Sequence, residues 1–293
     1  MKSINTLVED IYTTLASGKA KIDSTNLAKV LGDRIQNSQR SGDALRMSNL
    51  GEKCERKLWY RANKPEAAEP LDGRSLLNFL NGDIAEETVL SIVEQSGHEA
   101  VGRQEEVELY GVKGHIDAII DGVVVDVKSA NSRSIEKFKE HKLESDDPFG
   151  YLSQLDAYAA ALEHDSRVKI KGEFAFLAYN KENGSVVLDK YKRIKIDWKT
   201  KISSLRGMLA EAVAPKRAYL PEPDGKSGNM QLPMPCRYCQ FKRECYSNAN
   251  GGTGLREFLY SYGSKFLIHV GKEPNVQEVQ GKIQDTKLGK ETT

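Results

Sequence analysis

Two apolar runs joined by an Asp-Gly pair, in GHIDAIIDGVVVDVKSA over residues 114–130, constrain the fold of this chain most strongly. Asp-Gly between apolar runs favours a β-hairpin with a two-residue type I′ turn at Asp121 and Gly122. That turn fixes the register of the two strands, and one face of the hairpin becomes wholly apolar and must be buried. Three opposed pairs form this face: Ile120 with Val123, Ala118 with Val125, and Ile116 with Val127.

The other face of the predicted hairpin is charged. The same register places Asp117 opposite Asp126, and His115 opposite Lys128. Directly opposed residues have Cβ atoms about 4.5–5.5 Å apart, and like charges at that separation are destabilising. A hard divalent cation such as Mg²⁺ or Mn²⁺ would remove the repulsion, and Lys128 could help to deprotonate a metal-bound water. The alternative is a surface hairpin whose acids and lysine face solvent.

Three of the four cysteines, Cys236, Cys239 and Cys245, lie within ten residues, and the fourth is Cys54. The N-terminus lacks the apolar run of a signal peptide, and no run reaches membrane-spanning length, so we expect a soluble, cytoplasmic protein. Clustered cysteines in a reducing compartment are more often metal ligands than disulfides. One remote cysteine and a late triplet suit an iron–sulfur cluster and a zinc site about equally, with unligated or disulfide-bonded cysteines as a third alternative.

The remaining pattern predicts a mixed α/β chain. The 293 residues are enough for a sizeable core, and the net charge of +1 gives no overall sign of a nucleic-acid binder. Apolar spacing predicts helices over residues 1–48, in a short segment headed by Cys54, and over 76–95, 151–164 and 197–214. Expected strands cover residues 105–110, 112–120, 123–129, 171–180 and 185–196. A further helix follows residue 250, and the last twenty or so residues are expected to be disordered.

The D-x8-D-V-K pattern of the hairpin resembles the catalytic hairpin of the PD-(D/E)xK nuclease superfamily. Gln154 and Tyr158, with Tyr151 one helical turn before them, are similar to the Q-x3-Y motif that follows this hairpin in RecB-family nucleases. The sequence GDIAEE at residues 82–87 resembles their G-x3-H-E motif, with Glu86 where histidine is usual. Glutamate also binds hard cations, so this departure leaves open which metal is preferred.

The cysteines extend the resemblance, which spans about residues 50–246. Some RecB-like nucleases, including AddB-type recombination subunits and the nuclease of CRISPR adaptation, carry one cysteine before the nuclease core and three after it. Those four cysteines hold a [4Fe–4S] cluster, which the resemblance favours here over Zn²⁺. The implied organisation is a helical region at 1–48, a restriction-endonuclease-like core at 49–250 with a mixed sheet flanked by helices, and a helix and tail at 251–293.

The resemblance also implies roles for single residues. Mg²⁺ or Mn²⁺ would be bound by Glu86, Asp117, Asp126 and the Val127 carbonyl, with Lys128 as the catalytic lysine. Gln154 would hold Lys128 or the scissile phosphate, and Tyr158 would contact the strand being cut. Candidate DNA contacts are His115, Tyr151, Arg133 and Lys137, although Arg133, Lys137, Lys139 and Lys142 equally fit a solvated helix face. Glu87 is expected to be a surface acid. Trp59, Tyr60 and Arg61 could stack on bases of single-stranded DNA, although core packing is expected of Trp59.

Together these features predict a metal-dependent DNA exonuclease of phage or mobile-element type that acts in recombination, replication or repair. Its substrate would be single-stranded DNA or double-stranded DNA ends, and its products would carry a 5′-phosphate and a 3′-hydroxyl. No membrane is expected, and a homo-oligomer or a recombination or replication partner is possible. The alternatives are a CRISPR-adaptation nuclease and a catalytically weak module that binds DNA ends, which only Glu86 in place of histidine supports.

Overall fold

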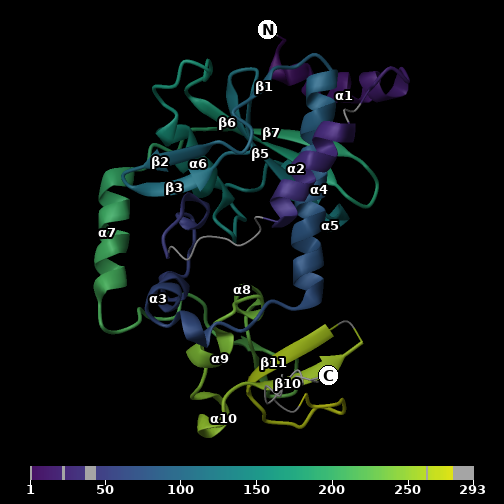
Figure 1. The fold of residues 1–293 in the computed structure, drawn as a ribbon. Helices are drawn as coiled ribbons and strands as arrows, with labels where there is room; N and C mark the ends of the chain where they lie inside the picture. The colour runs from purple at the N-terminus through teal and green to yellow at the C-terminus, as the bar shows by residue number, and fades with distance from the viewer. Residues whose placement is uncertain (1, 22–23, 37–43, 262, 280–293) are drawn as a thin grey trace, which may run out of the picture. The chain divides into compact units, whose positions relative to one another are not determined.

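The computed structural model describes residues 2–21, 24–36, 44–261 and 263–279 (Figure 1). The chain forms two compact units. The first contains Met1–Asn63 and Leu71–Pro215, and the second contains Lys64–Pro70 and Lys216–Thr293. The functional boundaries expected at residues 48 and 250 stay a prediction, and most of the predicted tail lies outside the described residues.

A five-stranded mixed sheet of order β1-β4-β5-β6-β7 is the centre of the first unit. Only β5 and β6 are parallel neighbours within this sheet, and the other neighbouring strands are antiparallel. Its strands are β1 (Ala100–Val101), β4 (Ala118–Ile120), β5 (Val123–Ala130), β6 (Glu173–Asn180) and β7 (Val186–Lys192). The mixed sheet expected of the core is therefore present.

The turn between β4 and β5 has the predicted form. Asp121 and Gly122 have φ values of 47° and 81°, and the type I′ turn requires positive φ at both positions. The expected pairs Ile120–Val123 and Ala118–Val125 are confirmed.

Beyond Ala118 the predicted register is wrong, because the segment expected as one strand forms two. The ladder ends at Ala118, so Ile116 does not pair with Val127. His115 is not opposite Lys128, since it ends β3 (Val112–His115), which pairs with β2 (Glu106–Leu109) in a separate two-stranded ribbon. The backbone N–H of Val127, which a continued ladder would bond to the Ile116 carbonyl, instead donates to Asp117 Oδ2 at 2.7 Å.

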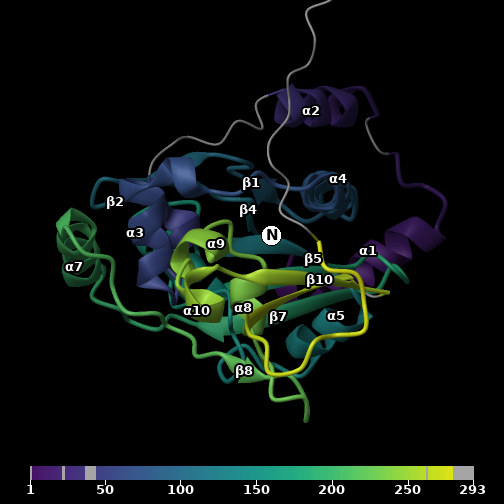
Figure 2. The ribbon, with the colours of Figure 1, turned by 90° about the horizontal axis from the view of Figure 1, so that it is seen from below.

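Helices cover both faces of the sheet, and Figure 2 shows α4 on one side of β5 and α5 on the other. Both faces of β5 are therefore buried, including the side expected to be charged. One face packs against α1 (Leu7–Ala16) and α4 (Gly73–Gln95), and the other against α5 (Ser132–Lys139), α6 (Tyr151–Ala161) and α7 (Trp198–Ala210). The first unit also contains η1 (Ile4–Thr6), α2 (Ser24–Gln36), η2 (Met47–Asn49) and α3 (Glu55–Asn63).

The second unit contains a four-stranded antiparallel sheet of order β10-β11-β9-β8. The helix expected after residue 250 is wrong, because β10 and β11 form an antiparallel hairpin there. Gly263, the first residue of β11, has a φ of 129°. Glycine disfavours a continuous helix and adopts this positive φ at little cost. The elements are η3 (Pro65–Ala67), β8 (Glu222–Pro223), β9 (Met230–Gln231), α8 (Met234–Arg237), α9 (Lys242–Cys245), α10 (Ala249–Gly252), β10 (Arg256–Tyr260) and β11 (Gly263–His269). None of the helices in the described parts of the chain is long and apolar enough to cross a membrane.

Candidate active site

Asp126 and Lys128 project from the same face of β5, because alternate residues of a strand share a face. Lys128 Nζ lies 2.7 Å from Asp126 Oδ2, and the two side chains are only 22% and 6% exposed. The same nitrogen lies 4.8 Å from the ring centroid of Tyr151 at the start of α6. A partly buried ammonium is thus held between a carboxylate and an aromatic ring.

Asp117 is the second carboxylate of the site. Burial raises the pKa of Asp117 well above its ordinary value, and the negative charges of Asp126 and Glu86 raise it further. Lys128 and the Val127 N–H act in the opposite direction but do not cancel these effects. The structure therefore brings the predicted carboxylates within electrostatic reach of one another, and a positive charge between them would be stabilising.

Lys128 is a cation at neutral pH. Burial lowers the pKa of Lys128, but the carboxylates of Asp126 and Asp117 raise it by more, so the net shift is upward. An ammonium with a raised pKa does not act as a general base near neutrality. It can hold a phosphate or stabilise the negative charge that develops during hydrolysis.

Glu86 lies on α4 and is held from a loop that the sequence did not indicate. Gln104 Nε2 donates to Glu86 Oε1 at 2.6 Å, and Gln104 has the left-handed φ of 54° that is uncommon for a residue other than glycine. The neighbouring Arg103 forms ion pairs with Glu87 and with Glu94. Glu87 is only 1% exposed, so its expected place at the helix surface is wrong.

Gln154 and Tyr158 come together on α6, as their spacing predicted. The Gln154 side chain is hydrogen-bonded to the Tyr158 hydroxyl, while burial and the charges of Asp126 and Asp117 raise the pKa of Tyr158. Tyr158 is 4% exposed and belongs to the main core. A Cβ at Gly114 would lie 2.8 Å from the Tyr158 hydroxyl, so only glycine fits there.

The start of α6 is fixed by contacts that the sequence did not indicate. Asp147 Oδ1 accepts from Tyr151 N, and Oδ2 accepts from Leu152 N, both at 2.9 Å. Gly150 has a φ of 73°, and a Cβ on it would lie 1.9 Å from the carbonyl oxygen of Gly51. This crossing of two backbones and the cap by Asp147 hold Tyr151 beneath Lys128.

Of the candidate DNA-contacting residues, His115, Arg133 and Lys137 lie on or beside α5 and β3, whereas Tyr151 lies half-buried on α6 against Lys128. Arg133 and His115 are exposed, and Lys137 Nζ lies 2.6 Å from an Asp146 carboxylate oxygen. Lys139 and Lys142 are likewise paired with acids of their own segment. This basic segment is therefore largely neutralised by neighbouring carboxylates in the structure.

Trp59 and Tyr60 do not form a stacking surface. They are 6% and 4% exposed, and Trp59 Nε1 donates to the Glu211 carbonyl at 2.8 Å. The interpretation of these rings as base-stacking groups is wrong, and the core packing expected of Trp59 is confirmed.

The donor chemistry of the site suits a hard divalent cation, since Asp117 and Asp126 supply carboxylate oxygens of mutually repelling charge. Nevertheless, among the described residues no three or more His, Cys, Asp or Glu side chains are grouped so as to hold a metal ion. Glu86 affects the pKa of Asp117 without completing such a group. The residues thus fit a cation in type, while a full set of three carboxylate ligands is not assembled.

The cysteines divide between the two units, with Cys54 in the first and the other three in the second. All four are partly buried. Cys239 N donates to the Cys236 carbonyl at 3.1 Å, and Cys236 and Cys245 pack against the small core around Tyr246. Among the described residues, these cysteines are not part of any group of three or more side chains that could hold a metal ion.

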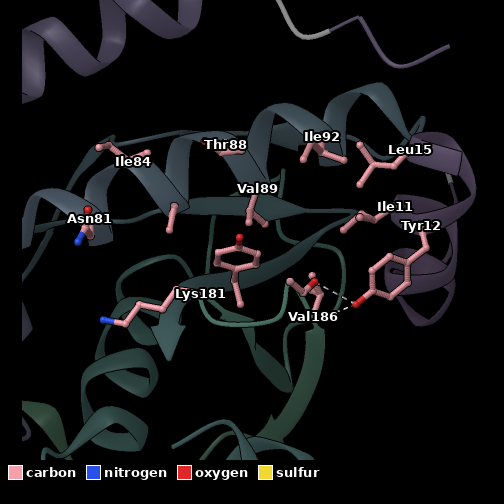
Figure 3. A pocket seen from close by; sticks show the side chains of 13 residues that line it. Ile11, Tyr12, Leu15, Asn81, Ile84, Thr88, Val89, Ile92, Lys181 and Val186 are labelled. Atoms are coloured by element: carbon pink, nitrogen blue, oxygen red, sulfur yellow. Dashed lines mark hydrogen bonds between the residues drawn. The ribbon is translucent and has the colours of Figure 1, made fainter. Parts of the chain in front are cut away.

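An apolar pocket of about 500 Å³ lies on the α4 side of the sheet, lined from α1, α4 and the β6–β7 connection (Figure 3). The Tyr12 hydroxyl closes one end, since it donates to the Gly184 carbonyl at 3.4 Å and accepts from Val186 N at 2.7 Å. Lys128 faces α6 instead. The pocket is therefore separate from the candidate active site.

The comparison with protein families agrees with the motifs of the hairpin. A family model described as the PD-(D/E)XK nuclease superfamily matches residues 27–246. A search of curated proteins gave no match. An alkaline exonuclease, LHK-Exo from Laribacter hongkongensis, is similar with a TM-score of 0.42 and 13% identity, over 59% of this chain and 90% of that one. A structure described as SSO0001 is similar with a TM-score of 0.40 and 18% identity, over 75% of this chain and 94% of that one.

Proposed function

Because the chain belongs to the PD-(D/E)XK nuclease superfamily, we propose that it is a deoxyribonuclease that hydrolyses phosphodiester bonds with a divalent metal ion. The observation that carries the proposal is the ion pair between Lys128 and Asp126 beside Asp117. Burial and, after it, the charges of neighbouring carboxylates raise the pKa of Asp117. A site that concentrates negative charge around one held ammonium is suited to a cation and a phosphate.

Each residue has a distinct part in the proposed reaction. Asp117 and Asp126 would hold Mg²⁺ or Mn²⁺, with Glu86 and the Val127 carbonyl as further oxygen ligands. When bound, the metal supplies an activated water and polarises the scissile phosphate. Lys128 holds the phosphate and stabilises its developing charge, and the products carry a 5′-phosphate and a 3′-hydroxyl. Gln154 holds Lys128 or the phosphate from α6, where it is anchored on Tyr158.

We propose that the enzyme acts as an exonuclease from DNA ends in recombination, replication or repair, as a phage or mobile-element protein. A role in CRISPR adaptation and a catalytically weak module that binds DNA ends are the alternatives. Digestion of internally and end-labelled single- and double-stranded DNA with Mn²⁺ distinguishes the exonuclease from the weak module. Release of mononucleotides or short fragments from ends supports the proposal, whereas binding to ends without hydrolysis supports the weak module.

We propose separately that Cys54, Cys236, Cys239 and Cys245 hold a [4Fe–4S] cluster, with Zn²⁺ as the alternative. The support is the number of thiols, since four thiolates complete either site. Iron, sulfide and zinc analysis of anaerobically purified protein, with its visible absorption spectrum, decides between them. About four irons and four sulfides per chain support the cluster, and one zinc in a colourless protein contradicts it.

A further inference from the structure

Phe149 is an exposed aromatic residue directly before the helix that carries the Gln154 motif. Its side chain is 52% exposed, although a phenylalanine gains most from burial. Its ring centroid lies 5.6 Å from that of Tyr151, with the ring planes tilted by 31°. A single exposed apolar side chain needs no explanation by itself, so its position relative to the active site decides whether it has a role.

Phe149 is the outer end of a row of rings that passes through the candidate active site. The next ring inward, Tyr151, lies beneath Lys128 Nζ at 4.8 Å. Tyr151 in turn lies 6.3 Å from Phe176 in the main core. A single ring therefore separates Phe149 from the candidate catalytic lysine, and the row leads from the core past Lys128 to solvent.

The loop that carries Phe149 is fixed on both sides. Asp147 is buried and accepts hydrogen bonds from two backbone amides of α6. Pro148 has a restricted φ, and Gly150 is pressed against the backbone of Gly51. The exposure of Phe149 is thus imposed by a well-anchored backbone, and a rigid aromatic surface costs little conformational entropy when it binds a flat partner.

A cation that could serve a phosphate lies beside the same loop. Lys137 pairs with Asp146, and these side chains are 31% and 59% exposed. Solvent-exposed ion pairs are weak, so Lys137 can exchange Asp146 for a phosphate at little cost. The surface next to Lys128 therefore offers a stacking ring and an exchangeable cation, which together bind single-stranded nucleic acid.

We infer that Phe149 stacks on a base of the DNA strand close to the scissile phosphate, and that this base must be unpaired. The inference rests on the proposed nuclease function and adds its substrate class, which is a single strand or a frayed end. A base inside a duplex is stacked between its neighbours and does not present its face to a side chain, so a base within the strand can stack on this ring only when it is unpaired.

The test measures binding of the full chain to single-stranded oligonucleotides in EDTA, where no cleavage interferes. Each oligonucleotide carries 2-aminopurine at one position counted from the end, because stacking quenches its fluorescence. Wild type and Phe149→Trp should quench one position strongly, whereas Phe149→Leu, which keeps apolar bulk without a ring, should not. Phe149→Ala should weaken single-strand binding by about 5- to 100-fold, the usual effect of losing one stacked base. Tyr110→Ala is the matched control, because Tyr110 is 53% exposed at the other end of the β2–β3 ribbon from His115.

An abasic scan separates stacking from a general loss of affinity. Removing the base at the quenched position should weaken the binding of the oligonucleotide to wild type and leave its binding to Phe149→Ala unchanged, since the two changes remove the same contact. Equal affinity of wild type and Phe149→Ala for single strands, or no wild-type affinity for single strands, overturns the inference. These readouts need no hydrolysis. If wild type cleaves DNA but Phe149→Ala binds single strands as tightly as wild type, only the stacking role is rejected. Stacking by a protein that cleaves no DNA rejects the nuclease function alone.

Discussion

The carboxylate of Asp117 accepts a hydrogen bond from the backbone N–H of Val127 at 2.7 Å, on the strand that carries Asp126 and Lys128. This bond ends the β4–β5 ladder and fixes Asp117 beside a second carboxylate. The chain retains this arrangement although burial and like charge raise the pKa of Asp117. A repulsive contact that a bound cation would relieve is a feature of a functional site.

Asp117→Asn should therefore stabilise the metal-free protein while it abolishes cleavage. Asparagine keeps an oxygen for the Val127 N–H but removes one half-buried negative charge. The pKa of the Asp117 carboxyl is higher in the folded protein than its unfolded value of 3.8. The folded protein therefore loses stability as the pH rises through the folded-state pKa of this carboxyl. The gain in the free energy of unfolding of Asp117→Asn over wild type should be about 1 kcal/mol at neutral pH and should vanish below about pH 4. Thermal unfolding in EDTA at several pH values measures it.

The control for this prediction is Asp146→Asn, which removes an exposed carboxylate paired with Lys137 and should change stability by less than about 0.5 kcal/mol. Mn²⁺ should raise the melting temperature of wild type, because it binds the folded state, and should do so much less in Asp117→Asn. A melting temperature that Asp117→Asn lowers at neutral pH in EDTA would contradict the electrostatic interpretation.

Tyr151→Leu should slow hydrolysis, whereas Tyr151→Phe should not. The ring of Tyr151 lies 4.8 Å from Lys128 Nζ, and phenylalanine keeps its aromatic face. A cation–π contact contributes about 0.5–2 kcal/mol, so leucine should reduce the single-turnover rate by about 2- to 30-fold. Equal rates for Tyr151→Leu and wild type, measured at saturating DNA, would show that the ring does not hold the lysine.

Gln104→Gly should separate stability from activity. Glycine adopts the φ of 54° at residue 104 without strain, so the folded protein should be as stable as wild type or more stable. The same change removes the 2.6 Å hydrogen bond to Glu86, and the metal-dependent rate should fall by about 10-fold, or 1.4 kcal/mol. Gln104→Asn, which also tolerates this φ, controls for the amide group. Full activity of the glycine variant would exclude Gln104 from the site.

Asp156→Ala should destabilise the first unit strongly. Asp156 is 0% exposed, and it accepts hydrogen bonds from Arg193 Nε at 2.7 Å and from Ile194 N and Trp198 Nε1 at 2.8 Å. Removing the acceptor leaves a guanidinium and two N–H groups buried, which costs about 3–5 kcal/mol. Urea unfolding followed by tryptophan fluorescence measures this loss in the free energy of unfolding, because both tryptophans lie in the first unit. Glu163→Ala, at an exposed position of the same region, is the control and should change stability little.

The sequence predicted those features that depend on neighbouring residues. Asp121-Gly122 determines a type I′ turn because both residues tolerate positive φ, and strand alternation places Asp126 and Lys128 on one face. The spacing of Gln154 and Tyr158 likewise requires only one helical turn. These local rules located the centre of the candidate site.

Contacts between distant segments were not predictable in the same way. The Asp117–Val127 bond depends on where the chain passes from the β2–β3 ribbon into β4 of the central sheet, and no local rule reports that path. Gln104 reaches Glu86 from a loop without periodicity, and nothing in its own segment indicates this contact. A short apolar run such as the one after residue 250 fits either period, so the pattern alone does not exclude the two strands that form there.

The most direct test of the central claim is the single-turnover rate of DNA hydrolysis with Mn²⁺ or Mg²⁺ for wild type, Lys128→Ala and Asp126→Asn. These residues form the 2.7 Å ion pair at the site, and loss of a group that stabilises developing charge costs about 10²–10³ in rate. Circular dichroism and thermal unfolding confirm that the variants are folded. We expect metal-dependent cleavage by wild type and at least a 100-fold loss in each variant. Cleavage by folded Lys128→Ala or Asp126→Asn at the wild-type rate would contradict the assignment of the active site.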